Sequence, residues 1–332
     1  MKRTLLYIVV CSAFAMTVSG QVRYFDERYV SSLSYLNPVL INPGATGMED
    51  THQIIAGYRN KWASFPDSPK TYSISYDGPV TDKLSFGAQF LADRNGSLTT
   101  SKVQGTIAYL LETADNKLNV GLAGEYIKHG LDDAVATNNL VEPGDILINE
   151  RILGNGYFDV SVGAFGVYDN TITYGLVLPA LVNSRIGDNT QDVDGRDFGY
   201  IFNVGYIYRS ASMDAVFEPS VYVKQLNNVP FHADINLMGK FADDRLRGGF
   251  TYTVGADERV GFLVGTTFNA LTLNYGYNLS RNEFQTYNNG SHEVTLRFDI
   301  GGSREVMTGE ETLMDMEDKD GVKGELRKTI ER

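Results

Sequence analysis

Hydrophobic and polar side chains alternate along most of this chain, in segments of about ten residues between residue 53 and Ile300. Segment 84–93 is a clear case: one face carries Leu84, Phe86, Ala88, Phe90 and Ala92, and the other carries Ser85, Gly87, Gln89 and Asp93. A period of two is that of a β-strand whose two faces meet different surroundings. The pattern therefore predicts an all-β chain whose strands each have one apolar and one polar face.

Fourteen segments of this kind can be delimited. They are 53–60, 69–77, 84–93, 101–111, 117–127, 157–168, 171–182, 198–209, 214–225, 231–241, 245–254, 258–268, 270–280 and 292–300. A tilted strand of about 9 to 11 residues crosses the hydrocarbon layer, whereas strands of soluble domains are typically about 5 to 6 residues long. The lengths and the even count predict a transmembrane antiparallel β-barrel over residues 53–300, and they disfavour a secreted sandwich.

The connections between the predicted strands differ in length on the two sides. Tight turns such as Asp77-Gly78 and Asn269-Ala270 follow even-numbered strands. Longer pieces follow odd-numbered strands: 128–156, 183–197 and 281–291, with short exceptions near Asn227 and Asp257. Outer-membrane barrels have short periplasmic turns and long external loops. We therefore expect the cell outer membrane as the location, and both termini in the periplasm.

The first twenty residues have the layout of a secretory signal peptide. Lys2 and Arg3 precede an apolar run from Leu5 to Met16, and Val18-Ser19-Gly20 follows. The run is shorter than the ~20 residues of a membrane-spanning helix. We expect residues 1–20 to be removed on export. Cys11 is the only cysteine of the chain, so the mature protein has no thiol chemistry.

Two segments flank the predicted barrel. Residues 21–52 contain LNPVLINPGATG, whose Asn-Pro steps and glycines predict a rigid irregular turn. This segment could plug the lumen from the periplasmic side. Residues 301–332 form a tail in which acidic side chains from Glu310 to Asp320 precede Lys323, Arg327 and Lys328. We expect a loosely structured periplasmic tail, with a partner-docking peptide as the alternative.

Charge narrows the possible partners. The net charge is −12 and the pI is about 4.8, which argues against nucleic acid as a partner. The predicted inner faces carry both signs: Glu218, Asp234, Glu293 and Asp299 against Lys224, Lys240, Arg247, Arg259 and Arg297. Such groups fit an open selective pore, and they equally fit pairs across a filled lumen.

Candidate chemistry is sparse. The histidines, His52, His129, His232 and His292, have neither zinc-site spacing nor a nucleophile motif around them. Loop 188–197 places Asp192, Asp194 and Gly195 as in part of a calcium loop, but Thr190 replaces the first aspartate. A solvated acidic loop is the commoner structure. We therefore expect no catalytic residue, no cofactor and no metal.

Residues 37–78 carry a composite motif. NPVLINPGATG is followed by YRNKWASFPDSPKTYSISYDGP, and the motif positions are Asn42, Pro43, Gly47, Tyr58, Arg59, Trp62, Phe65, Pro69 and Thr71. The motif resembles the N-terminal signature of the PorP/SprF family, outer-membrane components of the type IX secretion system and of gliding machinery. The tail beyond Ile300 departs from that pattern. Physically, Tyr58 and Trp62 fit a membrane interface, and Arg59 fits a phosphate or carboxylate.

The resemblance implies a non-enzymatic protein that helps a large cargo protein or adhesin reach or stay on the cell surface. Cargo would meet loops 128–156 and 183–197, secretion components would meet the periplasmic segments, and lipid would surround the barrel. Two alternatives remain: a plugged fourteen-stranded transport barrel for small substrates, and an outer-membrane barrel enzyme that modifies lipid.

Overall fold

The structure, a computed structural model, describes residues 27–29, 31, 34–132, 155–182, 184–185, 199–210, 212–226, 229–255, 258–281 and 288–301. The predicted signal peptide, most of loops 128–156 and 183–197, and the tail beyond Gly301 lie outside these ranges. Within them, no helix has the length and apolarity of a membrane span.

The strands are β1 (His52–Asn60), β2 (Lys70–Pro79), β3 (Leu84–Asn95), β4 (Leu98–Glu112), β5 (Asn116–Leu131), β6 (Asn155–Tyr168), β7 (Ile172–Leu178), β8 (Ser184–Arg185), β9 (Tyr200–Tyr206), β10 (Tyr208–Ser210), β11 (Ala215–Leu226), β12 (Val229–Phe241), β13 (Leu246–Gly255), β14 (Arg259–Phe268), β15 (Leu271–Ser280) and β16 (Ser291–Ile300).

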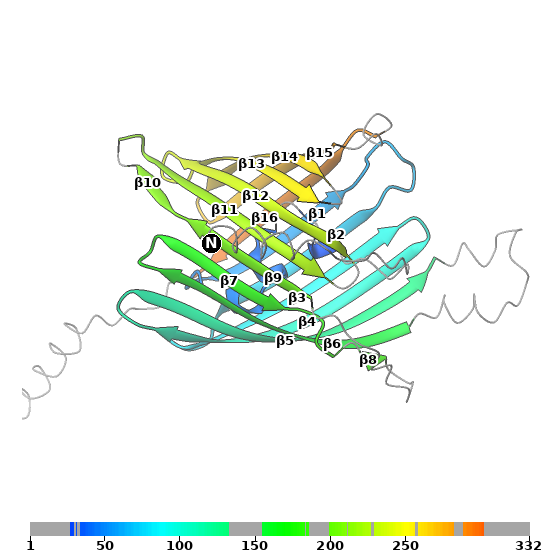
Figure 1. Cartoon of the computed structure of the whole chain (residues 1–332), viewed down its shortest axis with the longest axis horizontal. Coiled ribbons are helices and arrows are strands. Elements are labelled where there is room, and N and C mark those ends of the chain that lie inside the picture. The colour runs from blue at the N-terminus through cyan, green and yellow to red at the C-terminus, as the bar shows by residue number, and fades with distance from the viewer. Residues whose placement is uncertain are drawn as a thin grey trace, which may run out of the picture.

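The strands pair with their neighbours in antiparallel fashion around a closed ring (Figure 1). β1 pairs with β16, and β9 pairs with both β7 and β11. β9 and β10 are one barrel strand, because both pair with β11 and only Ile207 separates them. Pro219 of β11 lies beside this break and has no N–H to donate. With the two-residue β8 set aside, the ring has fourteen strands, which confirms the prediction.

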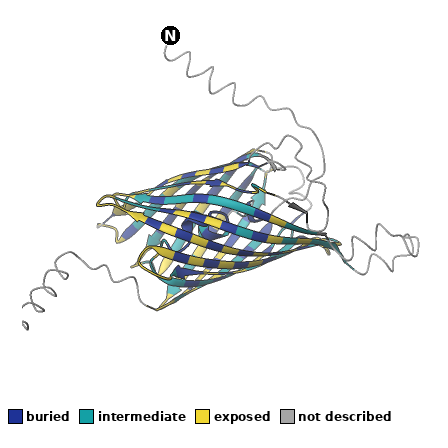
Figure 2. Ribbon diagram, turned by 90° about the horizontal axis from the view of Figure 1, so that it is seen from below, coloured by how far each residue is buried: buried dark blue, intermediate teal, exposed yellow. Residues whose placement is uncertain are grey.

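Buried and exposed residues alternate along the strands (Figure 2). In β3, Phe86 and Phe90 are more than 40% exposed, whereas Ser85 and Gln89 are buried. Buried polar side chains face inward on most strands, and exposed large apolar side chains cover the outer wall. This inversion of the usual order is what a lipid-facing wall around a polar lumen requires.

The connection between β3 and β4 differs from the prediction. Residues 94–100 were expected to form a loop, but both strands extend and meet in the two-residue turn Gly96-Ser97. Gly96 has a φ of +59°, a conformation that glycine adopts without strain. Three connections on this side of the barrel are therefore short, one more than predicted.

β7 is shorter than predicted and ends at Leu178 instead of residue 182. Pro179 follows, and Ala180 has a φ of +55°, so the chain leaves the ladder here. The Leu181 N–H still donates to the Val160 carbonyl at 2.8 Å. The apolar pair Leu181-Val182 continues an apolar run in the sequence but lies beyond the regular strand.

The barrel has two distinct ends. At the tight-turn end lie the connections 80–83, 113–115, 169–171, 211–214, 242–245 and 269–270. The connections at the loop end include 61–69, 132–154 and 179–199. β1 begins and β16 ends at the tight-turn end, because His52 pairs with Ile300.

The chain before β1 lies inside the ring. Its Asn-Pro steps lead into two short 3-10 turns, η2 (Pro38–Leu40) and η3 (Pro43–Ala45), and a third turn, η1 (Glu27–Tyr29), precedes them. We call residues 27–51 the lumen segment. Its contacts follow one another down β5: Arg28 with Glu125, Pro43 with Gly121, Thr46 with Asn119, and Asp50 with Lys117. These contacts cover roughly 26 Å of strand.

Candidate functional site

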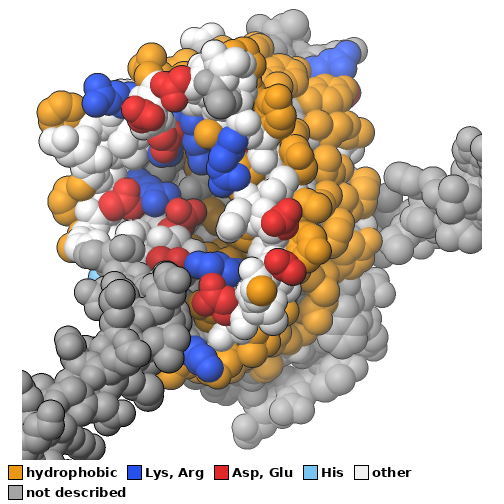
Figure 3. Space-filling model, turned by 90° about the vertical axis from the view of Figure 1, so that its left-hand side faces the viewer, with side chains coloured by type: hydrophobic (Ala, Val, Ile, Leu, Met, Phe, Trp, Pro, Cys, Tyr) orange, Lys and Arg blue, Asp and Glu red, His pale blue; other side chains and the backbone are white. Residues whose placement is uncertain are grey.

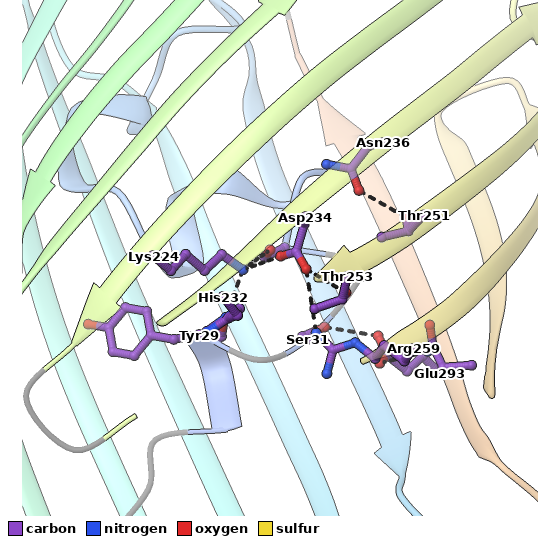
Figure 4. A network of polar contacts seen from close by, with 12 residues as sticks. Tyr29, Ser31, Lys224, His232, Asp234, Asn236, Thr251, Thr253, Arg259 and Glu293 are labelled. Atoms are coloured by element: carbon purple, nitrogen blue, oxygen red, sulfur yellow. Dashed lines mark hydrogen bonds and ion pairs between the residues drawn. The ribbon is translucent and has the colours of Figure 1, made fainter. Parts of the chain in front are cut away.

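Lys224 holds the first part of the lumen segment at the loop end (Figure 4). Its side chain, on β11, is fully buried. The ammonium donates to the Tyr29 carbonyl at 2.8 Å, to an Asp234 carboxylate oxygen at 2.7 Å and to Ser34 Oγ at 3.4 Å. A buried ammonium is stable only when its donors are satisfied, and here the lumen segment supplies two of the acceptors.

Asp234 of β12 balances that charge. It accepts a hydrogen bond from Thr253 Oγ1 at 2.6 Å, and Arg259 Nη2 lies 3.7 Å from it. His232 Nε2 lies 3.3 Å from the Tyr29 carbonyl, on the same side of the lumen. Two cations therefore flank one buried carboxylate. The partners are tightly interdependent, because removing one partner of a buried ion pair costs about 3–5 kcal/mol.

Arg59, a residue of the sequence motif, supports a second contact. Its Nε lies 2.9 Å from Glu293 Oε1, and both side chains are buried. The other Glu293 oxygen accepts a hydrogen bond from Ser31 Oγ at 2.9 Å. Arg59 thus engages a carboxylate, as its chemistry suggested, and this carboxylate belongs to the barrel wall and holds the lumen segment.

Arg28 supplies the third contact, in the opposite direction across the lumen. Its guanidinium makes a two-pronged ion pair with the buried Glu125 carboxylate of β5, with 2.9 Å between Nη2 and Oε1. Gln104 of β4 also accepts from Arg28, at 3.1 Å. We call Arg59, Glu125, Lys224, Asp234 and Glu293 the charged clamp. It fixes Arg28, Tyr29, Ser31 and Ser34 to three separate parts of the ring.

The second part of the lumen segment, around the Asn42-Pro43 turn, is held by close packing against the barrel wall. A Cβ on Gly121 would lie 2.2 Å from the Pro43 carbonyl oxygen, and one on Gly163 would lie 2.2 Å from Asn42 Oδ1. Asn42 Nδ2 donates to the Ala164 carbonyl at 3.0 Å. The inward-facing glycines of β5 and β6 therefore form a groove into which the Asn42-Pro43 turn fits, and any side chain there would exclude it.

Gly47 shows why its motif position is a glycine. Its φ is +70°, and its N–H donates to Asp77 Oδ2 at 2.8 Å. A Cβ would lie 2.2 Å from Ser85 Oγ. Both the backbone conformation and the close approach to β3 require glycine here.

The structure divides the motif between two places. Asn42, Pro43 and Gly47 lie in the lumen, whereas the remaining positions lie at the loop end on β1, β2 and their connection: Tyr58, Arg59, Trp62, Phe65, Pro69 and Thr71. The rings of Tyr58 and Tyr72 pack at 5.1 Å, and Lys61 Nζ lies 4.8 Å above the Trp62 ring. The motif is therefore not one binding site. Arg59 connects the two places, because it pairs with Glu293, and Glu293 accepts a hydrogen bond from Ser31 of the lumen segment.

The charged side chains predicted to face the lumen form pairs. Lys224 pairs with Asp234, Lys240 with Glu218, Arg59 with Glu293, Arg297 with Asp299, and Arg247 with Asp244. These pairs join side chains of the same strand, of adjacent strands, or of a strand and its turn, so they line the wall and do not span the lumen. Arg28 and Glu125 form the pair that joins the lumen segment to the wall.

The histidines lie apart from one another. His52 and His292 contact the hydroxyls of Tyr76 and Tyr275, His129 contacts Thr100, and His232 contacts the Tyr29 carbonyl. In the part of the chain that the structure describes, no three His, Cys, Asp or Glu side chains gather as metal ligands would. Loop 188–197 lies outside that part.

Sequence reasoning missed most lumen-segment members of this site. Arg28, Tyr29, Ser31 and Ser34 belong to no motif, and their partners are distant in the chain: Arg28 and Glu125 are 97 positions apart. The usable signal lay in the wall: inward positions with glycine, such as Gly121 and Gly163, mark a close approach of another backbone.

The Arg59→Gln variant is expected to destabilise the barrel by about 3 kcal/mol, because it leaves the Glu293 carboxylate buried without its guanidinium. Urea titration of the purified barrel in lipid would measure this as a lower unfolding midpoint. Arg281→Gln is the matched control, because the Arg281–Glu258 pair lies at the same end but is solvent-exposed. That control should lose less than about 1 kcal/mol. Equal shifts for the two variants would contradict a role for Arg59 in the clamp.

Comparison with known proteins gives a family and several structural likenesses. The model of the type IX secretion system membrane protein PorP/SprF matches residues 23–298. No curated protein matches. Similar solved structures include Acinetobacter baumannii Omp33, at 6% identity over 75% of this chain and 98% of that chain, with a TM-score of 0.44. The Ralstonia pickettii toluene transporter TbuX is 8% identical over 78% of this chain and 92% of that chain, with a TM-score of 0.46. Outer membrane phospholipase A from Escherichia coli is 12% identical over 76% of this chain and 90% of that chain, with a TM-score of 0.34.

None of these structural likenesses bears on what the chain does. The family match does, because it covers most of the sequence, including the lumen segment, the motif and the strands of the ring. The chain is an outer-membrane β-barrel that belongs to the PorP/SprF family of type IX secretion system membrane proteins.

Proposed function

We propose that this protein helps to export a large secreted cargo protein or adhesin, or to anchor it at the cell surface, and that it does so as a docking body without catalysis. The observation that carries the proposal is the segment held inside the lumen of a secretion-family barrel. Arg28, Lys224 and Glu293 tie the lumen segment to the wall, and the glycine groove seats its second half. A barrel with a chain segment fixed inside it in this way is suited to presenting surfaces at its two ends.

The two ends suit different partners. Short turns are typical of the periplasmic side of outer-membrane barrels, so we place the tight-turn end there, together with the tail 301–332. Charged side chains of both signs surround the opening at this end, and apolar side chains cover the outer wall (Figure 3). Secretion components would bind here. Cargo would bind at the loop end, through loops 128–156 and 183–197, because loops on a rigid scaffold carry recognition.

Affinity purification from the native envelope tests this assignment. We expect a tagged barrel to recover a large secreted protein together with secretion components, and the same barrel in a planar bilayer to conduct little current. A tagged barrel of another family from the same envelope serves as the control for non-specific recovery. A lone barrel that conducts ions or takes up small substrates would instead support a transport protein and refute the docking role.

A further inference from the structure

We propose that three cations on the outer wall at the loop end, Lys70, Arg94 and Lys128, bind the phosphate groups of the lipid that surrounds the barrel. They belong to β2, β3 and β5, and we call them the cationic collar. The collar concerns the membrane around the ring and not the cargo, so it stands whether or not the protein acts as a docking body.

The apolar cover of the outer wall ends just before each collar residue. The last outward-facing apolar side chains on these strands, toward the loop end, are Tyr72, Ala92 and Tyr126. Side chains on one face of a strand recur at every second residue. The next outward positions on the three strands are therefore 70, 94 and 128, and each of them holds a cation.

Tyrosines mark the edge of the hydrocarbon layer at this level. Tyr58 and Tyr72 lie opposite one another on β1 and β2, and their ring centroids are 5.1 Å apart. Tyr126 is exposed on the same outer wall. Tyrosine gathers at membrane interfaces because its ring is apolar and its hydroxyl is polar. Two residues along a strand span about 7 Å, which places the collar at the depth of the lipid headgroups.

Lys70 and Arg94 are directly opposite one another in the β2–β3 ladder. Like charges in opposed positions repel and destabilise a sheet. Arg94 Nη2 lies 2.7 Å from Asp132 Oδ2 in an exposed pair, which balances one of the three cations. Among the residues that the structure describes, no carboxylate pairs with Lys70 or Lys128. The collar therefore has an excess of positive charge that an anion from outside the chain would relieve.

The strand between the cations adds hydroxyl groups. On β4, Thr99 lies opposite Arg94, and Ser101 lies opposite Lys128. Both threonine and serine can donate to a phosphate oxygen. Neighbouring strands are 4.7–4.9 Å apart, so β2 to β5 cover about 14 Å of the wall. Over that width, the flexible stem of lysine and the forked donors of arginine can converge on one phosphorylated headgroup.

Another part of the ring shows the self-neutralised alternative. Beyond Val260 of β14 and Leu279 of β15, the next outward positions hold Glu258 and Arg281, which pair at 2.8 Å. The collar instead gathers cations alone, in a chain whose net charge is −12. Basic residues beside a bilayer are attracted to anionic headgroups. Lipid phosphate is therefore the anion that the position and the charge of the collar fit best.

Lipid retention by the purified barrel tests this proposal. Nanodiscs would contain phosphatidylcholine with a minor fraction of phosphatidic acid, whose headgroup is a bare phosphate, and native mass spectrometry would identify the lipids that stay bound. We expect the parent protein to be enriched in phosphatidic acid. The triple variant Lys70→Gln, Arg94→Gln, Lys128→Gln should lower this enrichment by about tenfold, because each cation near the lipid surface contributes to the attraction.

A second triple variant is the matched control: Lys83→Gln, Arg245→Gln, Arg281→Gln. It removes the same number of charges from exposed positions outside the collar and should retain the enrichment of the parent. The unfolding midpoints of all three proteins in pure phosphatidylcholine discs should agree, because the substituted side chains are not buried.

Three results would overturn the proposal. Equal enrichment in the parent and the collar variant would mean that the collar does not bind lipid phosphate. An equal loss in both triple variants would show a general effect of net charge. In pure phosphatidylcholine discs, inorganic phosphate might stabilise the parent against urea as strongly as phosphatidic acid does. That result would assign the site to soluble phosphate instead of lipid.

Discussion

Lys224→Met is expected to be the most destabilising single substitution in the barrel wall, at about 3–5 kcal/mol. Methionine keeps the apolar stem but removes the ammonium, so the Asp234 carboxylate loses its 2.7 Å partner in a buried site. The Tyr29 carbonyl loses its 2.8 Å donor at the same time. Urea unfolding of the barrel in lipid, followed by fluorescence of the sole tryptophan, Trp62, would measure the loss. Limited proteolysis should also begin to cut residues 27–34.

Two further variants make this expectation specific. Lys240→Met removes a lysine from a pair of similar length with Glu218, but that pair is more than a quarter exposed, so its loss should stay below about 1 kcal/mol. Lys224→Met combined with Asp234→Asn removes both charges and should recover much of the lost stability, because the cost lies mainly in the uncompensated carboxylate. If Lys224→Met and Lys240→Met unfold at the same urea concentration, the clamp does not hold the lumen segment.

Gly121→Val is expected to expel the Asn42-Pro43 turn from its groove and to open the lumen. The new Cβ would lie 2.2 Å from the Pro43 carbonyl oxygen and 2.8 Å from Gly44 N, and both are backbone atoms that cannot rotate away. The barrel ladder itself tolerates valine, a residue that favours strands. We therefore expect the ring to survive and the ion conductance of the purified barrel to rise well above that of the parent protein.

Gly105→Val, on the exposed outer face of the wall, is the control for the effect of valine on the strand itself. Gly105 lies on the neighbouring strand β4, and a Cβ there meets no atom within 4 Å. Its conductance in planar bilayers should equal that of the parent. Equal and low conductance for both valine variants, with both barrels folded, would mean that the groove does not position the lumen segment.

The barrel could be predicted from the sequence because lipid on one side and a polar lumen on the other impose a strict alternation on every strand. The predicted strand boundaries were wrong where the contrast between lipid on one face and a polar lumen on the other ends. Beyond the hydrocarbon layer both faces of β3 and β4 meet polar surroundings, so Arg94, Asn95 and Thr99 belong to strands but no longer alternate. At β7 an apolar run continues through Leu181-Val182, but Pro179 and the left-handed Ala180 end the strand before this pair.

The site was harder to predict than the wall. Lys224, Asp234 and Glu293 were placed on the inner face correctly, since period alone decides the face. Their partners depend on the path of a segment with no regular period, in which Tyr29 contributes its backbone carbonyl and Ser31 a single hydroxyl. Contacts of that kind leave no mark in composition or spacing. Only the glycines of the groove hinted that a second backbone passes close to β5 and β6.

The path of the lumen segment also constrains how the protein is assembled. The ring closes where β1 meets β16, and residues 27–51 are enclosed by it. Filling a closed ring would require the free N-terminus to be drawn through it end-on, with Arg28 losing water before it reaches Glu125. The N-terminus does not have to pass through the ring if the hairpins from β2 onward assemble around the lumen segment before the ring closes. We infer that β1 and β16 pair last, after the other strands have assembled around the lumen segment.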